Sequence, residues 1–199
     1  MSAADAIIDL YDRRACDWDA DRGRDLFERP WLERFAALLP PGGTVLDIGC
    51  GAGDPIARHF LNAGYEITGV DSGAGMIAIC REKFPTAAWI VSDMRELDLG
   101  KAFDGILAWH SLFHLTPEDQ VRMFPIFRKH ARPGTALMFT SGILHGDHVG
   151  EWRGEPLYHG SLDEDVYRRL LDENGFDLVH HIAGDADCGN ANIWLCRAR

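Results

Sequence analysis

The sequence has few of the features that mark secreted, membrane-spanning or metal-binding proteins. Its 199 residues include five cysteines, an odd number without a C-x-x-C pair, so we expect neither a disulfide framework nor a zinc cage. No apolar run is long enough to span a membrane, and the N-terminus lacks the apolar core of a signal peptide. These absences predict a cytoplasmic protein with reduced thiols and no membrane partner.

Positive charge is also scarce. The chain has 20 lysines and arginines against 31 aspartates and glutamates, which gives a net charge of −11. A protein that modifies nucleic acid usually presents a basic stripe to the phosphates. The short pairs Arg13-Arg14 and Arg128-Lys129 are interspersed with acids. The charge therefore weighs against a nucleic-acid substrate.

Strand and helix signals alternate along most of the chain. We expect helices over residues 3–19 and 26–39, and from residue 44 apolar strand segments alternate with capped helices. Thr116 and Pro117 open one of these helices, and Pro125 should kink or break it. Residues 161–164 form a capping box for a helix over 162–174. This alternation predicts an α/β fold with a doubly wound, mostly parallel sheet and helices on both faces.

The most informative segment is Val45–Gly53 (VLDIGCGAG), which is typical of a buried strand followed by a glycine-rich loop. Glycines at positions 49, 51 and 53 let the backbone turn sharply and lie flat against a ligand. Asp54 and Pro55 should open the next helix, with Asp54 as its N-cap. Because Asp47 and Asp54 flank the loop, a pyrophosphate is disfavoured there and a positively charged ligand is favoured.

Acids also end the next two strands. Asp71 follows the strand Tyr65–Val70, and its carboxylate can accept both hydroxyls of a ribose, at about 1.5–3 kcal/mol for each charge-assisted hydrogen bond. Asp93 follows the strand Trp89–Val91 and precedes Met94, a pairing that suits the edge of an adenine ring. The ends of parallel strands share one rim of the sheet, where ligands bind. The sequence therefore predicts a nucleoside site at this rim.

The motifs VLDIGCGAG, GVDSGAGMI, SDM and FDGILAWHSLFHL, in this order and spacing, resemble those of the class I, seven-strand Rossmann-like family of S-adenosylmethionine-dependent methyltransferases. The resemblance extends from Thr44 to the C-terminus. It implies a seven-stranded sheet with an antiparallel last strand, S-adenosylmethionine as cofactor and S-adenosylhomocysteine as product. It further implies a single domain over 1–199, made of an N-terminal helical cap (1–40), a cofactor-binding half (44–140), an acceptor-side insertion (141–160) and a C-terminal helix and strands (161–199).

The resemblance also implies roles for individual residues. Gly49 and Gly51 would contact the methionine part of the cofactor, and Asp47 would lie near its ammonium group. Asp71 would hold the ribose, and Asp93 the adenine amine. The remaining expected cofactor contacts are aromatic or sulfur-containing side chains: Met76 and Met94 beside the adenine, Tyr11 and Trp18 from the cap, and Trp109.

Two histidines follow the fourth strand, at the rim where the methyl group would project. Much of the catalysis of methyl transfer can be positioning, worth about 7–11 kcal/mol at best, and a base is needed only if the acceptor must lose a proton. His110 is the first candidate for a base or acceptor-orienting group and His114 the second, because an unperturbed imidazole titrates near pH ~6.5. The alternative is that either one only shapes the pocket through hydrogen bonds. His145 and His148 have no further ligands at a fixed spacing, so we predict no metal site.

Together these patterns predict an enzyme that methylates an oxygen, nitrogen or carbon atom of a small-molecule acceptor, with acceptor contacts in the insertion 141–160. Two alternatives remain open: a methyltransferase acting on protein or RNA, and a non-catalytic module that binds the cofactor. An NAD oxidoreductase is a more distant one. The chain lacks the Asn/Asp-Pro-Pro-aromatic signature of DNA amino-methyltransferases, so no DNA partner is expected. The sequence does not indicate an oligomeric state.

Overall fold

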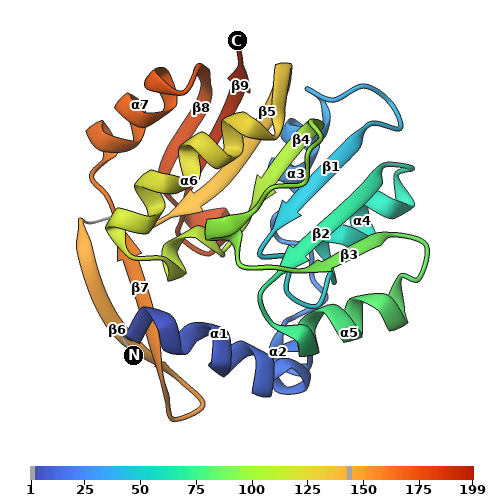
Figure 1. The fold of residues 1–199 in the computed structure, drawn as a ribbon, viewed down its shortest axis with the longest axis vertical. Helices are drawn as coiled ribbons and strands as arrows, with labels where there is room; N and C mark the ends of the chain where they lie inside the picture. The colour runs from blue at the N-terminus through green and yellow to red at the C-terminus, as the bar shows by residue number, and fades with distance from the viewer. Residues whose placement is uncertain (1–2, 143–144) are drawn as a thin grey trace.

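The computed structural model describes residues 3–142 and 145–199. A seven-stranded sheet forms its centre, with the strand order β3-β2-β1-β4-β5-β9-β8 (Figure 1). Its strands are β1 (Thr44–Ile48), β2 (Glu66–Asp71), β3 (Ala88–Val91), β4 (Phe103–Ala108), β5 (Ala131–Ser141), β8 (Phe176–Asp185) and β9 (Ala191–Ala198).

The strand directions confirm the predicted topology. Strands β1 to β5 pair in parallel, whereas β9 lies between β5 and β8 and runs antiparallel to both. The chain order reverses between β1 and β4, because β2 and β3 extend the sheet on one side and β5 on the other. Ligands of doubly wound folds bind at such a reversal, outside the carboxyl ends of the strands.

Helices cover both faces of the sheet (Figure 1). Neighbouring strand residues point to opposite faces, so Leu46 and Ile106 join the core under α6 and α7, whereas Val45 and Leu107 join the core with α3 and α4. The helices are α1 (Ala3–Arg13), α2 (Ala15–Asp21), α3 (Arg29–Ala36), α4 (Ile56–Asn62), α5 (Ala74–Lys83), α6 (Pro117–Lys129) and α7 (Glu164–Glu173). Three short 3-10 turns are η1 (Met94–Glu96), η2 (Leu112–His114) and η3 (Ala186–Cys188).

Two expectations for the N-terminal half are wrong. The helix expected over 3–19 is interrupted at Arg14, whose backbone angles of φ −110° and ψ 17° leave the helical region and separate α1 from α2. Asp54 does not cap α4, because Pro55 is the N-cap residue there. The Asp54 carboxylate instead accepts two hydrogen bonds from Arg58, at 2.8 and 3.0 Å. A bidentate ion pair has thus replaced the cap.

Helix α6 confirms the predicted start at Thr116 and Pro117 and excludes a break at Pro125, whereas the alternative of a kink there stays a prediction. Thr116 is the N-cap, and its Oγ1 accepts a hydrogen bond from the backbone N–H of Asp119 at 3.2 Å. The helix does not break at Pro125. An interior proline costs about 3 kcal/mol. The fully buried Met123, Phe124 and Phe127 offset it, because burying each such side chain contributes about 1.5–3 kcal/mol.

The capping box predicted before α7 is absent. The helix begins at Glu164, and Asp163 occupies the N-cap position without a side-chain hydrogen bond to the helix. The Ser161 hydroxyl lies in the buried interior instead, where it donates to the carbonyl oxygen of Gly142 at 3.0 Å. The end of α7 matches the prediction, since Gly175 follows it with φ +74°.

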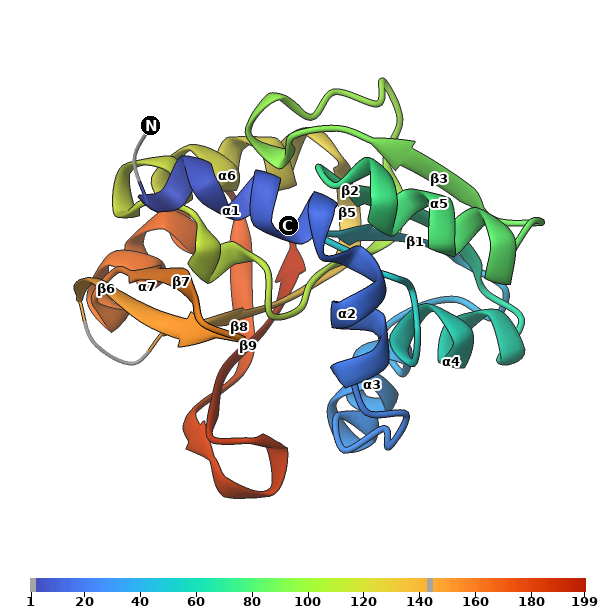
Figure 2. The same cartoon turned by 90° about the horizontal axis from the view of Figure 1, so that it is seen from below.

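The insertion 141–160 contains a β-hairpin that the sequence analysis did not identify. Strands β6 (Gly146–Trp152) and β7 (Glu155–Ser161) pair antiparallel as a separate two-stranded sheet. The hairpin lies next to α1, and α1 and α2 cross the carboxyl ends of the parallel strands (Figures 1 and 2). Both added segments therefore cover the rim where the predicted site lies.

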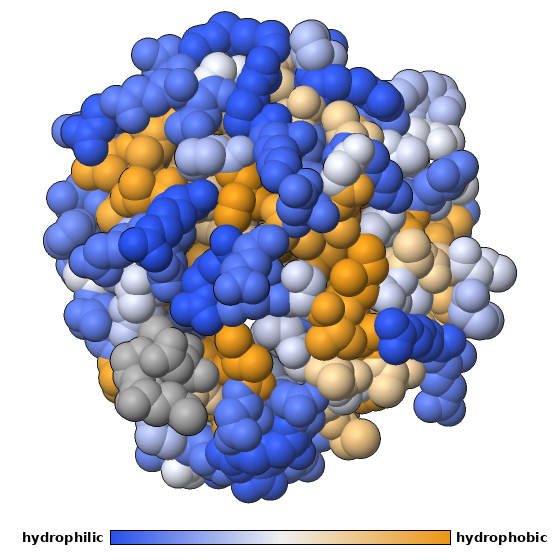
Figure 3. All heavy atoms as spheres, viewed as in Figure 1, coloured by the Kyte–Doolittle hydropathy of each residue, from blue (hydrophilic) through white to orange (hydrophobic). Residues whose placement is uncertain are grey.

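The face shown in Figure 3 carries many hydrophilic side chains, with hydrophobic atoms exposed between them. Phe27 and Val149 are among the large hydrophobic side chains that remain exposed. Across the described ranges, no helix combines the length and the apolar character needed to cross a membrane.

We expect Thr116→Ala to lower the free energy of unfolding by about 1 kcal/mol, because the first turn of α6 loses its side-chain acceptor. Thr116→Ser keeps the hydroxyl and should stay close to wild type. Urea denaturation followed by circular dichroism measures both. Equal stability of the alanine and serine variants would show that this cap contributes nothing.

Candidate active site

Two adjoining cavities lie at the carboxyl rim of the sheet, with volumes of about 100 and 460 Å³. They share a wall drawn from α1, α2, the loop after β1 and the segment after β4. The shared residues are Tyr11, Trp18, Gly49, Gly51, His110 and His114. All six are residues that the sequence singles out, so the fold brings together segments up to a hundred residues apart.

The smaller cavity is lined by the acidic end of β2. Asp71 Oδ2 accepts a hydrogen bond from Gly51 N at 2.9 Å, and Oδ1 accepts one from Gly73 N at 2.8 Å. Burial raises the pKa of Asp71, and these backbone hydrogen bonds oppose the rise. Each oxygen keeps further lone-pair capacity on the cavity side. This carboxylate can therefore accept hydrogen bonds from two neighbouring hydroxyls, as its expected ribose role requires.

Asp93, Met76 and Met94 line the same cavity. Met76 is buried, and Met94 is half-buried. The Asp93 carboxylate accepts hydrogen bonds from Arg95, including one from the guanidinium Nη2 at 2.6 Å. Arg95 also bonds Asp119 at 3.2 Å. The expected contact of Asp93 with an adenine amine stays a prediction. In that arrangement the adenine amine and Arg95 would both donate hydrogen bonds to the Asp93 carboxylate.

Gly49 and Gly51 form the turn between the two cavities, with φ of +74° and +52°. A Cβ atom on Gly49 would lie 2.2 Å from the Cβ of Ser111, whose hydroxyl donates to the Ile48 carbonyl oxygen at 2.7 Å. At Gly51 the nearest atom is Trp18 Nε1, at 3.6 Å. Gly49 is thus required by close packing, whereas Gly51 leaves the backbone open to a ligand.

Asp47 is an unpaired buried acid in the larger cavity. Its exposed fraction is 5%, and among the described residues none donates a hydrogen bond to its carboxylate. Burial, followed by the nearby Asp71 carboxylate, raises the pKa of Asp47 to about 7. A buried carboxylate without a partner is costly, so a cationic group beside it would be stabilised. Trp109 is also buried and lines this cavity.

His110 occupies a strained position at the end of β4. Its φ of +51° is rare for a residue with a side chain, and its backbone N–H donates to Thr140 Oγ1 at 2.8 Å. Burial and the nearby Arg22 lower the pKa of His110 to about 4. The imidazole is therefore neutral near pH 7 and can accept a proton or a hydrogen bond. Such strain is found most often at functional sites.

His114 is held at both ring nitrogens. Nδ1 lies 2.9 Å from the Tyr158 carbonyl oxygen, which can only accept, so Nδ1 carries the proton. Nε2 then accepts from the Tyr11 hydroxyl at 3.0 Å. Burial lowers the pKa of His114 to about 4. The ring thus connects α1 to the hairpin, which supports the alternative that His114 shapes the pocket.

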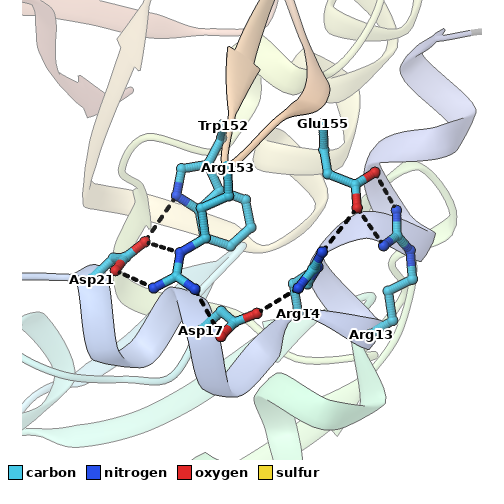
Figure 4. Close-up of polar contacts among 7 residues, drawn as sticks. All are labelled: Arg13, Arg14, Asp17, Asp21, Trp152, Arg153 and Glu155. Atoms are coloured by element: carbon cyan, nitrogen blue, oxygen red, sulfur yellow. Dashed lines mark hydrogen bonds and ion pairs between the residues drawn. The ribbon is translucent and has the colours of Figure 1, made fainter.

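Ion pairs fasten the hairpin to α1 and α2 above the cavities (Figure 4). At one end, Glu155 accepts two hydrogen bonds from Arg13, each at 2.7 Å. At the other, Arg153 donates to both oxygens of Asp21 at 2.8 Å. The full set, which we call the hairpin clamp, is Arg13, Arg14, Asp17, Asp21, Trp152, Arg153 and Glu155.

The structure adds cavity residues that the sequence analysis missed. Phe113 and Leu157 line the larger cavity, as does Arg22, which forms an ion pair with the fully buried Glu28. Leu157 lies in the insertion 141–160, which the sequence analysis assigned to acceptor contacts as a whole without singling out this residue. No sequence pattern indicates the Arg22–Glu28 pair. Across 3–142 and 145–199 there is no cluster of three or more His, Cys, Asp or Glu residues that could hold a metal ion.

Comparison with known proteins gives the site its context. Residues 45–134 match the methyltransferase domain family. A trans-aconitate 2-methyltransferase of Escherichia coli O157:H7 is 37% identical over 174 residues, which cover 83% of this chain and 64% of that protein. These matches confirm the resemblance to class I S-adenosylmethionine-dependent methyltransferases. The chain spans about half to two thirds of the length of curated relatives that it matches.

Solved methyltransferases share the fold. The structure of magnesium protoporphyrin IX methyltransferase from Synechocystis PCC 6803, with S-adenosylhomocysteine bound, has a TM-score of 0.76 at 17% identity and covers 100% of both chains. The S-adenosylmethionine complex of CalS10, an amino pentose methyltransferase from Micromonospora echinaspora, has a TM-score of 0.75 at 15% identity and covers 94% of this chain and 96% of its own. At these identities the likeness concerns the fold.

We expect Gly49→Ala to destabilise the protein by about 1–3 kcal/mol, because the added methyl group overlaps Ser111. Gly51→Ala is the matched control, since it has the same sign of φ but an open neighbourhood, and its cost should be smaller. Thermal and urea denaturation of both variants measure the difference. An equal cost at the two positions would contradict the packing argument.

Proposed function

We propose that this protein transfers a methyl group from S-adenosylmethionine to a small-molecule acceptor and releases S-adenosylhomocysteine. The observation that supports this proposal best is the pair of acids on either side of the Gly49–Gly51 turn. Asp71 is hydrogen-bonded by backbone amides and suits ribose hydroxyls, whereas Asp47 is buried without a partner and suits the methionine ammonium. Asp71 lines the smaller cavity and Asp47 the larger one, so the two acids suit the two polar ends of this cofactor.

S-adenosylmethionine supplies an activated methyl group, and this chain's residues supply position and environment. The Gly49–Gly51 turn allows the backbone to approach the ligand closely. The α1–α2 segment and the hairpin cover the cavities, which limits water at the reacting atoms. His110, neutral and facing both cavities, can accept a proton from the acceptor.

Three observations support a small-molecule acceptor. The larger cavity, about 460 Å³, falls in the usual range of small-molecule sites, roughly 300–1,000 Å³. Asp21 and Trp152 of the hairpin clamp line this cavity, so the added hairpin encloses it together with α2. The net charge of −11 disfavours RNA.

All five cysteines are free thiols, which supports the cytoplasmic location proposed from the sequence.

The activity is tested by measuring S-adenosylhomocysteine release from S-adenosylmethionine in two incubations, with the small-molecule fraction and with the macromolecular fraction of a cell extract. We expect release only with the small-molecule fraction. Release only with the macromolecular fraction would favour a protein or RNA substrate. Tight S-adenosylhomocysteine binding without release in either incubation would favour a non-catalytic binding module.

Asp71→Ala should weaken S-adenosylhomocysteine binding by at least about tenfold, because a lost charge-assisted hydrogen bond costs about 1.5–3 kcal/mol. Asp98→Ala, which removes an exposed carboxylate paired with Lys129, serves as the charge control and should leave binding unchanged. Isothermal titration calorimetry measures both. Unchanged affinity of a folded Asp71→Ala variant would refute the ribose assignment.

Binding should also depend on pH through Asp47. With a pKa of about 7, this carboxyl is mostly protonated at pH 6 and mostly ionised at pH 8. A cationic ammonium requires the ionised form, so S-adenosylhomocysteine affinity should rise roughly tenfold between these pH values. Asp47→Asn should abolish the rise, and adenosine, which lacks the ammonium, should not show it. An equal slope in Asp47→Asn would contradict the assignment.

A further inference from the structure

The larger cavity extends beyond the expected cofactor contacts into a region that we call the acceptor end. Its walls are mostly ring faces and apolar side chains. Phe113 and His159 lie 5.3 Å apart between ring centroids, and Trp152 contacts Trp18 edge-on at 5.5 Å. The residues of the acceptor end are Phe27, Phe113, Trp152, Leu157 and His159. Such walls favour a flat, apolar ligand.

The charges around this cavity are unsuited to an anion. Arg22 is the one lysine or arginine among its described lining residues, and it forms an ion pair with Glu28, which is fully buried. The acids in the lining are Asp21, Asp47 and Asp54. Asp21 and Asp54 are paired with Arg153 and Arg58, whereas Asp47 has no partner among the described residues. A bound carboxylate would therefore lose its hydration and meet the unpaired Asp47 without finding an unpaired cation, which is strongly unfavourable.

The histidines do not change this balance. Burial holds the pKa of His110 and of His114 at about 4, and burial and the nearby His148 lower the pKa of His159. All three rings are thus neutral near pH 7 and add no positive charge to the cavity. A neutral imidazole can instead take the proton of a hydroxyl group.

We infer that the acceptor is an uncharged aromatic molecule that carries a hydroxyl group, a phenol or its heteroaromatic equivalent, and that polycarboxylates are excluded. The inference rests on the proposed function and names its substrate class. In the reaction the acceptor oxygen gains the methyl group, the carbon–sulfur bond of the sulfonium breaks, and the hydroxyl proton passes to His110. This chain would then differ in acceptor from the trans-aconitate 2-methyltransferases that it is similar to.

Calorimetry on the full-length protein tests the inference. S-adenosylhomocysteine is titrated first, and its failure to bind would contradict the proposed function itself. The loaded protein is then titrated with 2-naphthol, trans-aconitate and protonated 2-phenylethylamine. We expect 2-naphthol to bind at least about tenfold more tightly than either charged probe. No binding of 2-naphthol, or tighter binding of a charged probe, overturns the inference while leaving the methyltransferase proposal intact.

Variants of Phe113 test the contribution of aromatic contacts to acceptor binding separately from that of charge. Phe113→Ala should weaken 2-naphthol binding by about fivefold or more while S-adenosylhomocysteine affinity changes less than about twofold. Phe113→Leu, which keeps apolar volume without a ring, should retain part of the affinity. If the alanine variant binds 2-naphthol as wild type does, the acceptor does not use this wall, and the inference fails.

Glu28→Gln provides a gain-of-binding test. The isosteric amide leaves Arg22 with an uncompensated charge at the cavity, so trans-aconitate affinity should rise about tenfold. Glu33→Gln changes an exposed acid on α3 and should have no effect. Thermal denaturation establishes that each variant is folded. If folded Glu28→Gln binds trans-aconitate no more tightly than wild type does, the argument that the cavity excludes anions for lack of an unpaired cation is wrong. If Glu28→Gln does not fold, the Phe113 variants test the inference.

Discussion

The carboxylate of Asp71 connects the parts of the structure on which the site depends. Through Gly51 N it holds the turn that follows β1, and through Gly73 N it holds the segment that begins α5. These bonds keep the backbone amides satisfied where the chain order of the sheet reverses. They also orient both carboxylate oxygens, so one side chain holds the turn and would make the proposed ribose contact. The close fit of Gly49 against Ser111 fixes the same turn from the opposite side.

Enclosure of the site comes from segments added to the sheet. The ion pairs of the hairpin clamp are largely exposed, and such pairs contribute little individually and weaken with salt. The buried contacts between the same segments are the Tyr11–His114 hydrogen bond and the His114 bond to the Tyr158 carbonyl oxygen. The hairpin is therefore joined to α1 and α2 by buried hydrogen bonds, by ring contacts of Trp152 with Tyr11 and Trp18, and by the exposed ion pairs of the hairpin clamp.

The electrostatics of the site follow from one property, an excess of buried acid. Burial raises the pKa of both Asp47 and Asp71, and the Asp71 carboxylate raises the pKa of Asp47 further. A cationic cofactor relieves this cost, whereas an anionic ligand would increase it. The neutral histidines and the Arg22–Glu28 pair leave the acceptor end without free positive charge. This balance of charge is the basis for proposing the cofactor ammonium beside Asp47 and an uncharged molecule at the acceptor end.

The sequence by itself determined the features that depend on local pattern: the glycine turn, the acids that end β2 and β3, the cap at Thr116 and, through its family motifs, the strand topology. Only the tertiary structure decided where distant contacts outweigh local preference. The cases are the buried Ser161, the unbroken helix at Pro125 and the hairpin over 146–161. Local propensities are worth about 1 kcal/mol per residue or less, and burial or an ion pair formed across the fold can exceed them.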